Sequence, residues 1–527
     1  MRVVVVGGTG NVGSAVLRAL HVAPEVTSVV GVARRVPLHT KDEDADVEWI
    51  ALDVGAPTSS PEAEDALVGR LEAVLSHADA VIHLAWLIQP SHERDALRRT
   101  NVDGTRRVLQ ACARARVDRV VVASSVGAYS PVDDDEPRDE ASPVTGIPTS
   151  MYSVDKAAQE RVLEAFAAAH PHISLAWLRP ALIFQRRAGS EVGRYFFGRT
   201  VPPALLAPGR LPALPWPRGF RLQAVHADDV ADAYVRAVLR RARGPFNVAA
   251  PDVLRGPDLA ALLDGGRVVP VPAPVARAAL AWGWQAHLVP VDPGWLDMAG
   301  GAPVLDTGRA RRELGWRPRH TAAEAVREVF SGLAQGASSA TPALRRRGEE
   351  VVPGEVDRER LGHYLADHLT GARAGESRFR RAARRHARTP VGPALGDLAR
   401  SVGEEREALS VITQMLGFHP RGVRSMGARL AEHLARLKPD GAGRLGSRAA
   451  LLLDLELLRA AVVAKAGAWQ TLRRLAPPLG LDGDGFARLA EQADAQSARL
   501  AALHAEVEQS AFSGDAQVPE PDQGRLT

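Results

Sequence analysis

The hydrophobic pattern of the first 180 residues alternates between short apolar runs and longer stretches with helical spacing. The first run, 3–6, is four valines, and similar runs occupy 26–33, 47–54, 79–85 and 119–125. Short apolar runs bounded by turn residues are typical of buried strands, and helical patterns separate most of them. The alternation predicts a doubly wound α/β domain of the Rossmann type, whose parallel sheet binds ligands at the carboxyl ends of its strands.

A glycine-rich turn follows the first predicted strand. Gly7, Gly10 and Gly13 have the spacing of a tight turn, and from Ser14 onward the apolar residues recur with helical spacing. The amide groups that begin a helix have no partners within it, and they bind anions. An ordinary turn would also contain glycines, but the order of strand, turn and helix favours a pyrophosphate site.

Candidate acid–base residues follow the fifth predicted strand. Ser125 ends that strand, and Tyr152 and Lys156 lie four residues apart at the start of a predicted helix, so they share one helical face. An ammonium close to a phenol favours the phenolate and lowers its pKa toward the working range of a general acid–base. The chain contains only five tyrosines and four lysines, which makes a chance pair at this spacing a poor explanation.

These motifs resemble, in order, those of the extended short-chain dehydrogenase/reductase family, also called the NAD-dependent epimerase/dehydratase family. The resemblance covers residues 1 to about 335. Further motifs that carry it are Asp53-Val54, His83-Leu84-Ala85, Asn101 to Thr105, Ser124-Ser125 with Tyr129, Glu160, Arg179-Pro180, 225–230 and 314–318.

The resemblance implies a role for each matching residue. Tyr152 would donate and accept the proton, Lys156 would bind the nicotinamide ribose and tune Tyr152, and Ser125 would hold the substrate oxygen. Asp53 would contact the adenine, and hydride would pass between the nicotinamide and a carbon that carries a hydroxyl or carbonyl. The implied cofactor-binding set is Gly7, Gly10, Asn11, Val12, Gly13, Asp53, Val54, Leu84, Ala85, Asn101, Tyr152 and Lys156.

Two arginines follow the second predicted strand. An NAD enzyme of this type normally has an acidic residue there for the ribose 2′-hydroxyl, but this chain has Ala33, Arg34 and Arg35. A guanidinium binds phosphate through two parallel hydrogen bonds, so these residues suit a ribose 2′-phosphate. We therefore expect NADP to be preferred over NAD, with solvated surface arginines as the alternative.

The region from about 181 to 335 is expected to bind the substrate. Nucleotide-sugar enzymes of the family usually have an asparagine shortly after the sixth strand, which is missing after Pro180, and Arg221 is only close to their usual arginine position. Such a substrate is therefore in doubt. Aromatic residues such as Phe196 and Trp295 can line an apolar pocket, although the core of a small subdomain is the commoner arrangement. Trp86 either narrows the substrate site or packs internally.

The C-terminal third shows only helical patterns. The segment 336–356 has the composition of a linker, and a helical bundle is expected over 357–512, followed by a disordered tail, 513–527. The bundle weakly resembles ferritin-like bundles in the number and length of its helices, but it has no Glu-x-x-His motif, so we predict no metal. Its helices are expected at about 358–388, 391–416, 449–475 and 485–512, with a shorter one near 422–437.

Composition and charge exclude several classes of protein. The net charge is +4 over 527 residues, so we expect no nucleic-acid binding, and the arginines of 378–388 point to several sides of one helix. A single cysteine, Cys112, excludes an internal disulfide framework. No uncharged run is long enough to span a membrane, and Met1 leads directly into a strand, which favours a cytoplasmic protein.

The combined prediction is an NAD(P)-dependent oxidoreductase or epimerase/dehydratase-like enzyme that acts on a small molecule by Ser-Tyr-Lys chemistry. The alternative is a dinucleotide-sensing or scaffold protein without turnover, in which the helical bundle binds a partner. A homodimer is left open.

Overall fold

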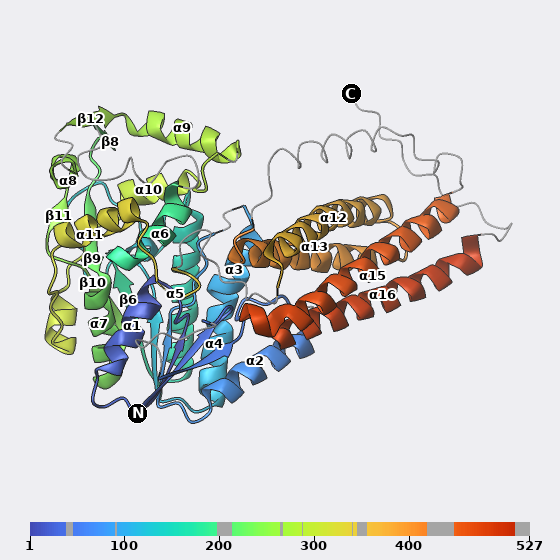
Figure 1. Cartoon of the computed structure of the whole chain (residues 1–527), viewed down its shortest axis with the longest axis horizontal. Coiled ribbons are helices and arrows are strands. Elements are labelled where there is room, and N and C mark those ends of the chain that lie inside the picture. The colour runs from blue at the N-terminus through green and yellow to red at the C-terminus, as the bar shows by residue number, and fades with distance from the viewer. Residues whose placement is uncertain are drawn as a thin grey trace. The chain divides into compact units, whose positions relative to one another are not determined.

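The computed structural model describes residues 1–37, 46–58, 60–89, 92–197, 213–263, 267–286, 288–339, 341–344, 356–418 and 447–511. The chain forms two compact units (Figure 1). The first comprises Met1–Val356 together with two short later segments, Met415–Gly417 and Ala476–Asp482. The second comprises Asp357–Gln414, Phe418–Leu475 and Gly483–Thr527. Within the described ranges, no helix has both the length and the apolar character needed to cross a membrane.

A seven-stranded sheet forms the centre of the first unit. The strands lie in the order β10-β6-β5-β4-β1-β2-β3, and all neighbouring pairs are parallel. The strand order reverses between β1 and β4, and ligands of such sheets bind at this point. The predicted fold class is confirmed. The strands are β1 (Arg2–Val6), β2 (Ser28–Ala33), β3 (Val47–Ala51), β4 (Ala80–His83), β5 (Arg119–Ala123), β6 (Ser174–Pro180) and β10 (Gly244–Val248).

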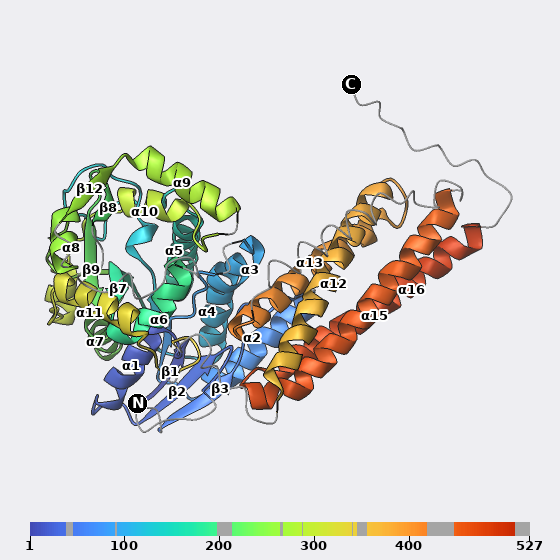
Figure 2. The same ribbon diagram turned by 45° about the horizontal axis from the view of Figure 1, so that its top comes forward.

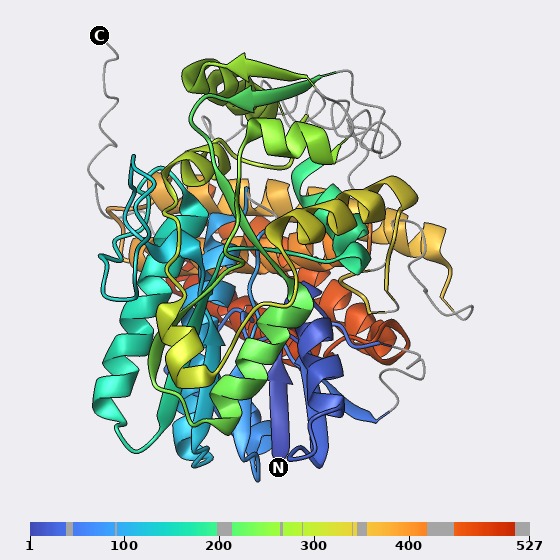
Figure 3. The same cartoon turned by 90° about the vertical axis from the view of Figure 1, so that its left-hand side faces the viewer.

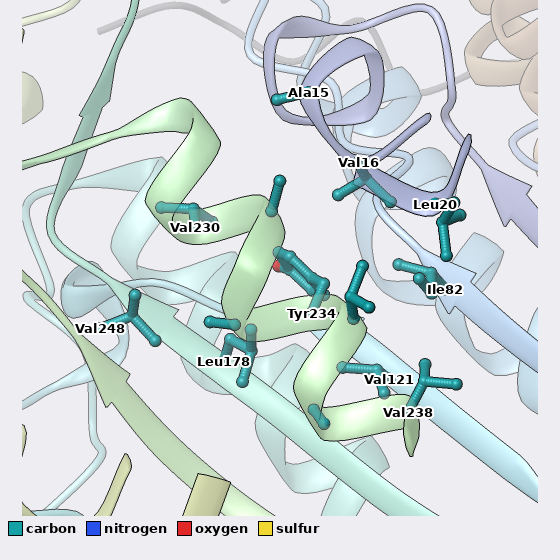
Figure 4. Packing of buried hydrophobic residues seen from close by; sticks show 14 of the residues in the cluster. Ala15, Val16, Leu20, Ile82, Val121, Leu178, Val230, Tyr234, Val238 and Val248 are labelled. Carbon is teal, nitrogen blue, oxygen red and sulfur yellow. The ribbon is translucent and has the colours of Figure 1, made fainter. Parts of the chain in front are cut away.

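Helices cover both faces of this sheet, which explains the uninterrupted apolar runs in the sequence. Val3 and Val5 pack with α1 (Asn11–His21) and α7 (Ala227–Leu239), whereas Val4 and Val6 face the opposite core. That core is completed by α2 (Pro61–Leu75), α4 (Gly104–Arg114) and α5 (Met151–Ala169). In Figure 4, Tyr234 of α7 lies among side chains of α1 and of the strands.

A small subdomain lies beyond the carboxyl ends of the central strands. It contains a three-stranded sheet of β7 (Leu182–Phe184), β9 (Leu222–His226) and β11 (Val253–Leu254), and a parallel pair of β8 (Leu214–Pro217) and β12 (Val268–Val271). Figure 3 shows this pair at the end of the unit toward which β1 points. Its helices are α8 (Gly256–Leu262), α9 (Ala273–Gln285), α10 (Gly294–Gly301) and α11 (Ala322–Gln335).

Several shorter helical elements connect these parts. They are α3 (Arg94–Arg98), η2 (Arg99–Asp103), η3 (Val126–Ala128), η4 (Arg186–Ala188), α6 (Gly189–Val192), η5 (Gly193–Phe197) and η7 (Ala310–Leu314). The single cysteine lies inside the first unit, where Cys112 is fully buried.

Long helices form the C-terminal part of the chain. They are α12 (Arg358–Arg385), α13 (Gly392–Met415), α15 (Ser447–Leu479) and α16 (Gly483–Ala511), and they confirm a helical region after the α/β domain. Figure 2 shows α12 beside α13 and α15 beside α16. The helix expected near 422–437 and the tail 513–527 lie outside the described residues. The resemblance to a ferritin-like bundle stays a prediction.

Replacing Val16 by alanine should lower the free energy of unfolding by about 2 kcal/mol, because it removes two fully buried carbons and leaves a cavity. Val22 is the matched control, since it ends the same helix with 77% of its surface exposed. Val22→Ala should change stability by less than about 0.5 kcal/mol. Urea unfolding followed by far-ultraviolet circular dichroism measures both, and equal losses would contradict this packing.

Candidate functional site

The glycine turn brings the ends of β1 and β4 into direct contact. Gly7 has a φ of +95°, which favours glycine, and a Cβ there would lie 2.5 Å from the amide nitrogen of Ala85. A Cβ on Gly13 would lie 2.4 Å from the carbonyl oxygen of Gly7. The turn is therefore a cradle that side chains would fill, and it suits a ligand that approaches the main chain closely.

The start of α1 is built to receive an anion. Gly10 is the N-cap residue and provides no side-chain cap, and the first turn contains no acidic residue. The main-chain amides of this first turn have no acceptor within the helix. Asn11 is held away from them, because its Oδ1 accepts a 2.7 Å hydrogen bond from Gln185 and its Nδ2 donates to Ile183. These features fit a dinucleotide pyrophosphate.

The structure also brings the predicted Ser125 and Tyr152 together. Ser125 follows β5, and its Oγ accepts a 3.0 Å hydrogen bond from the amide of Gly127. Tyr152 lies in the first turn of α5, whose N-cap Ser150 is bonded to Ser153. Burial raises the pKa of Tyr152 to about 12, and its hydrogen bond with Ser125 opposes that rise. The phenol is therefore protonated at neutral pH.

Lys156 is the centre of a buried hydrogen-bond chain. Its Nζ donates to the carbonyl of Ala123 at 2.8 Å and to Oε1 of Gln159 at 3.0 Å. Gln159 in turn donates to Thr105, which contacts His83 at 3.1 Å. Burial holds the pKa of Lys156 well below its usual value. Burial, aided by the nearby lysine, also lowers the pKa of His83 to about 3, so His83 is neutral.

Sequence reasoning missed Gln159 and Thr105 as parts of this chain. Gln159 follows Lys156 by three residues and so lies on its helical face, which is the one signal that the sequence offered. Thr105 lies within the 101–105 motif but carries no chemistry that marks it by itself.

A second buried network joins β5, β6 and α5. The guanidinium of Arg179 binds the carboxylate of Glu160, with 2.6 Å between Nη2 and Oε2, and both side chains are about 1–2% exposed. Glu160 also accepts hydrogen bonds from Ser124 and Trp177. A buried charge that loses a hydrogen-bond partner is costly in free energy, so this network fixes α5 against the sheet. It thereby also positions the residues at the start of the helix.

The other predicted cofactor residues lie at the carboxyl ends of the strands. Leu84 and Ala85 are beside Gly7. Asn101 clamps the segment after β4, since its side chain makes two hydrogen bonds with the main chain of Leu87. Asp53 accepts a hydrogen bond from the amide of Gly55, and the neighbouring Val54 and the helical Val12 pack against the two cores. Their roles toward a cofactor stay predictions.

The two arginines after β2 have different surroundings. Arg34 is partly exposed. Arg35 is only 3% exposed, and its Nε and Nη1 donate to the carbonyls of Leu479 and Met415, which belong to the same compact unit. A 2′-phosphate would have to compete with these carbonyls for Arg35.

Aromatic side chains contact Tyr152 and Lys156, the predicted acid–base residues. The ring of Trp86 meets that of Tyr152 edge-on, with 5.7 Å between centroids, and the Nζ of Lys156 lies 3.4 Å from its centroid. The ring of Trp295 is tilted against that of Tyr152, with 4.8 Å between centroids. Trp86 therefore lies directly on the site.

No group of three or more His, Cys, Asp or Glu side chains in the described part of the chain is placed to hold a metal ion. The expectation of a metal-free protein stays a prediction.

A parallel seven-stranded sheet with a glycine turn at its switch point defines a Rossmann-type domain. Residues 3–249 match the model of the NAD dependent epimerase/dehydratase family, and this N-terminal part of the chain belongs to that family.

Similar proteins differ in how much of this chain they cover. An uncharacterized protein of Mycobacterium tuberculosis is 27% identical over 333 residues, which are 62% of this chain and 29% of that protein. The chain therefore spans less than a third of that relative. The UDP-glucose 4-epimerase of Azospirillum brasilense is 28% identical over 384 residues, 67% of this chain and 96% of that one. The structure of MoeE5 in complex with UDP-glucuronic acid and NAD is 21% identical, with a TM-score of 0.46, and the match covers 64% of this chain and all of that one.

Replacing Gly13 by alanine should weaken dinucleotide binding at least ~tenfold, because the added Cβ would force the turn apart. Gly69 in α2 is the matched control, since nothing lies within 4 Å of a Cβ there. Gly69→Ala should bind dinucleotide like the unmodified chain. Isothermal titration calorimetry measures both affinities, and equal binding by the two variants would argue against the turn as the cofactor site.

Proposed function

We propose that this chain is an NAD(P)-dependent oxidoreductase or epimerase/dehydratase-like enzyme that moves hydride to or from a hydroxyl- or carbonyl-bearing carbon of a small molecule. One observation carries the proposal: the Ser125, Tyr152 and Lys156 side chains gather at the carboxyl end of β5, in the same sheet as the glycine turn after β1. The bound dinucleotide would supply or accept the hydride.

The residues divide the proton chemistry among them. During reduction, the protonated Tyr152 donates its hydroxyl proton to the carbonyl oxygen, and Ser125 hydrogen-bonds that oxygen. In the opposite direction, the phenolate of Tyr152 removes the proton of a substrate hydroxyl. When Lys156 is protonated, its ammonium would favour the phenolate electrostatically, and its hydrogen bonds to Ala123 and Gln159 fix its position.

The glycine turn and the start of α1 would hold the pyrophosphate, and Asp53 the adenosine. The preference for NADP now depends mainly on Arg34, because Arg35 is occupied by main-chain carbonyls. A ribose hydroxyl that binds Lys156 would take the place that the ring of Trp86 holds at 3.4 Å.

A second candidate function is a dinucleotide sensor or scaffold without turnover. The contact between Trp86 and Lys156 supports it, because the ring covers the ammonium that the reaction needs. The helical unit has a core of its own and would then carry the partner. The acid–base set supports the enzyme instead, since a sensor has no need of Tyr152.

Tyr152→Phe distinguishes the two functions. For the enzyme, it should lower turnover at least ~100-fold and leave dinucleotide affinity unchanged, because only the hydroxyl is lost.

Since burial raises the pKa of Tyr152, the rate of alcohol oxidation by the unmodified chain should increase ~tenfold per pH unit between about pH 7 and 10, while the rate of carbonyl reduction stays level. Stopped-flow absorbance of NAD(P)H measures these rates. Unchanged function of Tyr152→Phe in cells would favour the sensor.

Arg34→Ala should lower the affinity for NADP at least ~tenfold and leave that for NAD within about twofold, because only NADP carries the 2′-phosphate. Calorimetric titration of the full chain with each dinucleotide provides the measurement. Tighter binding of NAD than of NADP by the unmodified chain would end the case for NADP.

A further inference from the structure

Tyr152 and three other aromatic side chains form a continuous cluster. Tyr152 contacts Trp86 at 5.7 Å and Trp295 at 4.8 Å between ring centroids, and Phe196 meets Trp295 edge-on at 5.1 Å. We call these four residues the aromatic cluster. Because Trp86 and Trp295 both contact the ring of Tyr152, a molecule that reaches its hydroxyl would lie close to aromatic rings.

Methionine adds to this apolar surface. A Cβ built on Gly127 would lie 3.0 Å from Cε1 of Tyr152 and 3.1 Å from Sδ of Met298, so Met298 of α10 lies beside the phenol ring. Thioether sulfur packs favourably against aromatic rings and adapts to irregular apolar shapes.

The segments that carry the aromatic cluster are tied together. Nε2 of Gln89, on the segment after β4, donates to the carbonyl of Pro290 at 2.7 Å and to that of Tyr195 at 3.5 Å. These carbonyls belong to the chain just before α10 and to η5. Arg94, at the start of α3, forms an ion pair with the buried Asp155 of α5. The rings are therefore held in place before any substrate binds.

Two arginines beside α10 already have carboxylate partners. Arg221 lies 3.2 Å from Asp135, donates to the carbonyl of Ala302 beside α10, and is only 7% exposed. Arg277 of α9 is paired with Asp297 of α10 at 2.8 Å. A diphosphate is bound by guanidinium or ammonium groups that have no competing carboxylate, and these two arginines, within the described ranges, do not meet that requirement.

We infer that the substrate is an uncharged ketone or aldehyde with an aromatic or alicyclic body, rather than a nucleotide sugar. This inference rests on the proposed function. Hydride from NAD(P)H adds to the carbonyl carbon, the C=O π pair becomes an O–H bond with the proton of Tyr152, and the products are an alcohol and NAD(P)⁺. The phenolate then recovers a proton from water. Flat apolar bodies stack on Trp86 and Trp295, whereas sugar hydroxyls would lose water there without gaining partners.

The experiment uses the full chain and three ketones, namely 1-tetralone, acetophenone and 2-decalone, with UDP-glucose as the competing class. Ketone-dependent consumption of NADPH or NADH measures turnover. Trp295→Ala should raise the KM for the ketones at least ~tenfold, because it removes one face of the aromatic cluster. Trp282→Ala is the matched control, since Trp282 of α9 is 68% exposed, and its KM should stay within about twofold.

Binding is measured separately as ligand-dependent protection of Tyr152→Phe from thermal unfolding, with dinucleotide present. If the ketones protect the chain and the Trp295→Ala substitution abolishes this protection, the substrate class is supported even when no turnover is observed. Protection without turnover would mean that only the proposed function fails. The inference is overturned if none of the three ketones protects the chain, if UDP-glucose is turned over, or if Trp282→Ala and Trp295→Ala behave alike.

Discussion

No side chain fits between Gly7 and Ala85, and the geometry of the candidate site depends on this close approach of two strand ends. It holds the turn after β1 against the end of β4, and β4 is paired with β5, which leads to Ser125. A wider separation would move the start of α1 away from Ser125 and Tyr152. One steric restriction thus sets the distance between the proposed cofactor site at the glycine turn and the proposed proton donor, Tyr152.

The polar groups behind this site are buried and nearly all have partners, which makes the site rigid. Lys156, Gln159 and Thr105 form one chain of hydrogen bonds, and Arg179 with Glu160 forms a separate network on the same helix. Buried polar groups stabilise a protein only when their hydrogen bonds are satisfied, so both networks restrict α5 to one position. Tyr152, in the first turn of α5, is consequently positioned by residues further along that helix and on the elements packed against it.

The sequence predicted the parts of the molecule that local rules govern. The strands followed from runs of β-branched residues, such as 3–6, that are buried on both faces. The Tyr152–Lys156 pair followed from helical periodicity, since four residues place them on one face. Contacts between distant segments were beyond such rules. Trp295 lies 143 positions after Tyr152, and nothing in its neighbourhood indicates that their rings meet. Arg35 was predicted to be a phosphate ligand because its acceptors lie 380 and 444 positions away in the sequence.

The hydrogen bonds of Arg35 indicate which parts of the sequence belong to the α/β unit. Its acceptors, Leu479 and Met415, belong to segments that return to this unit after the 336–356 region, and Val36 also donates its amide to Gly480. A fragment that stopped at residue 356 would lack these carbonyls, so the Arg35 guanidinium would lose both hydrogen bonds. Hydrogen bonds to charged groups contribute about 1.5–3 kcal/mol each. The α/β unit is thus discontinuous in sequence, and two segments of the C-terminal third contribute to its stability.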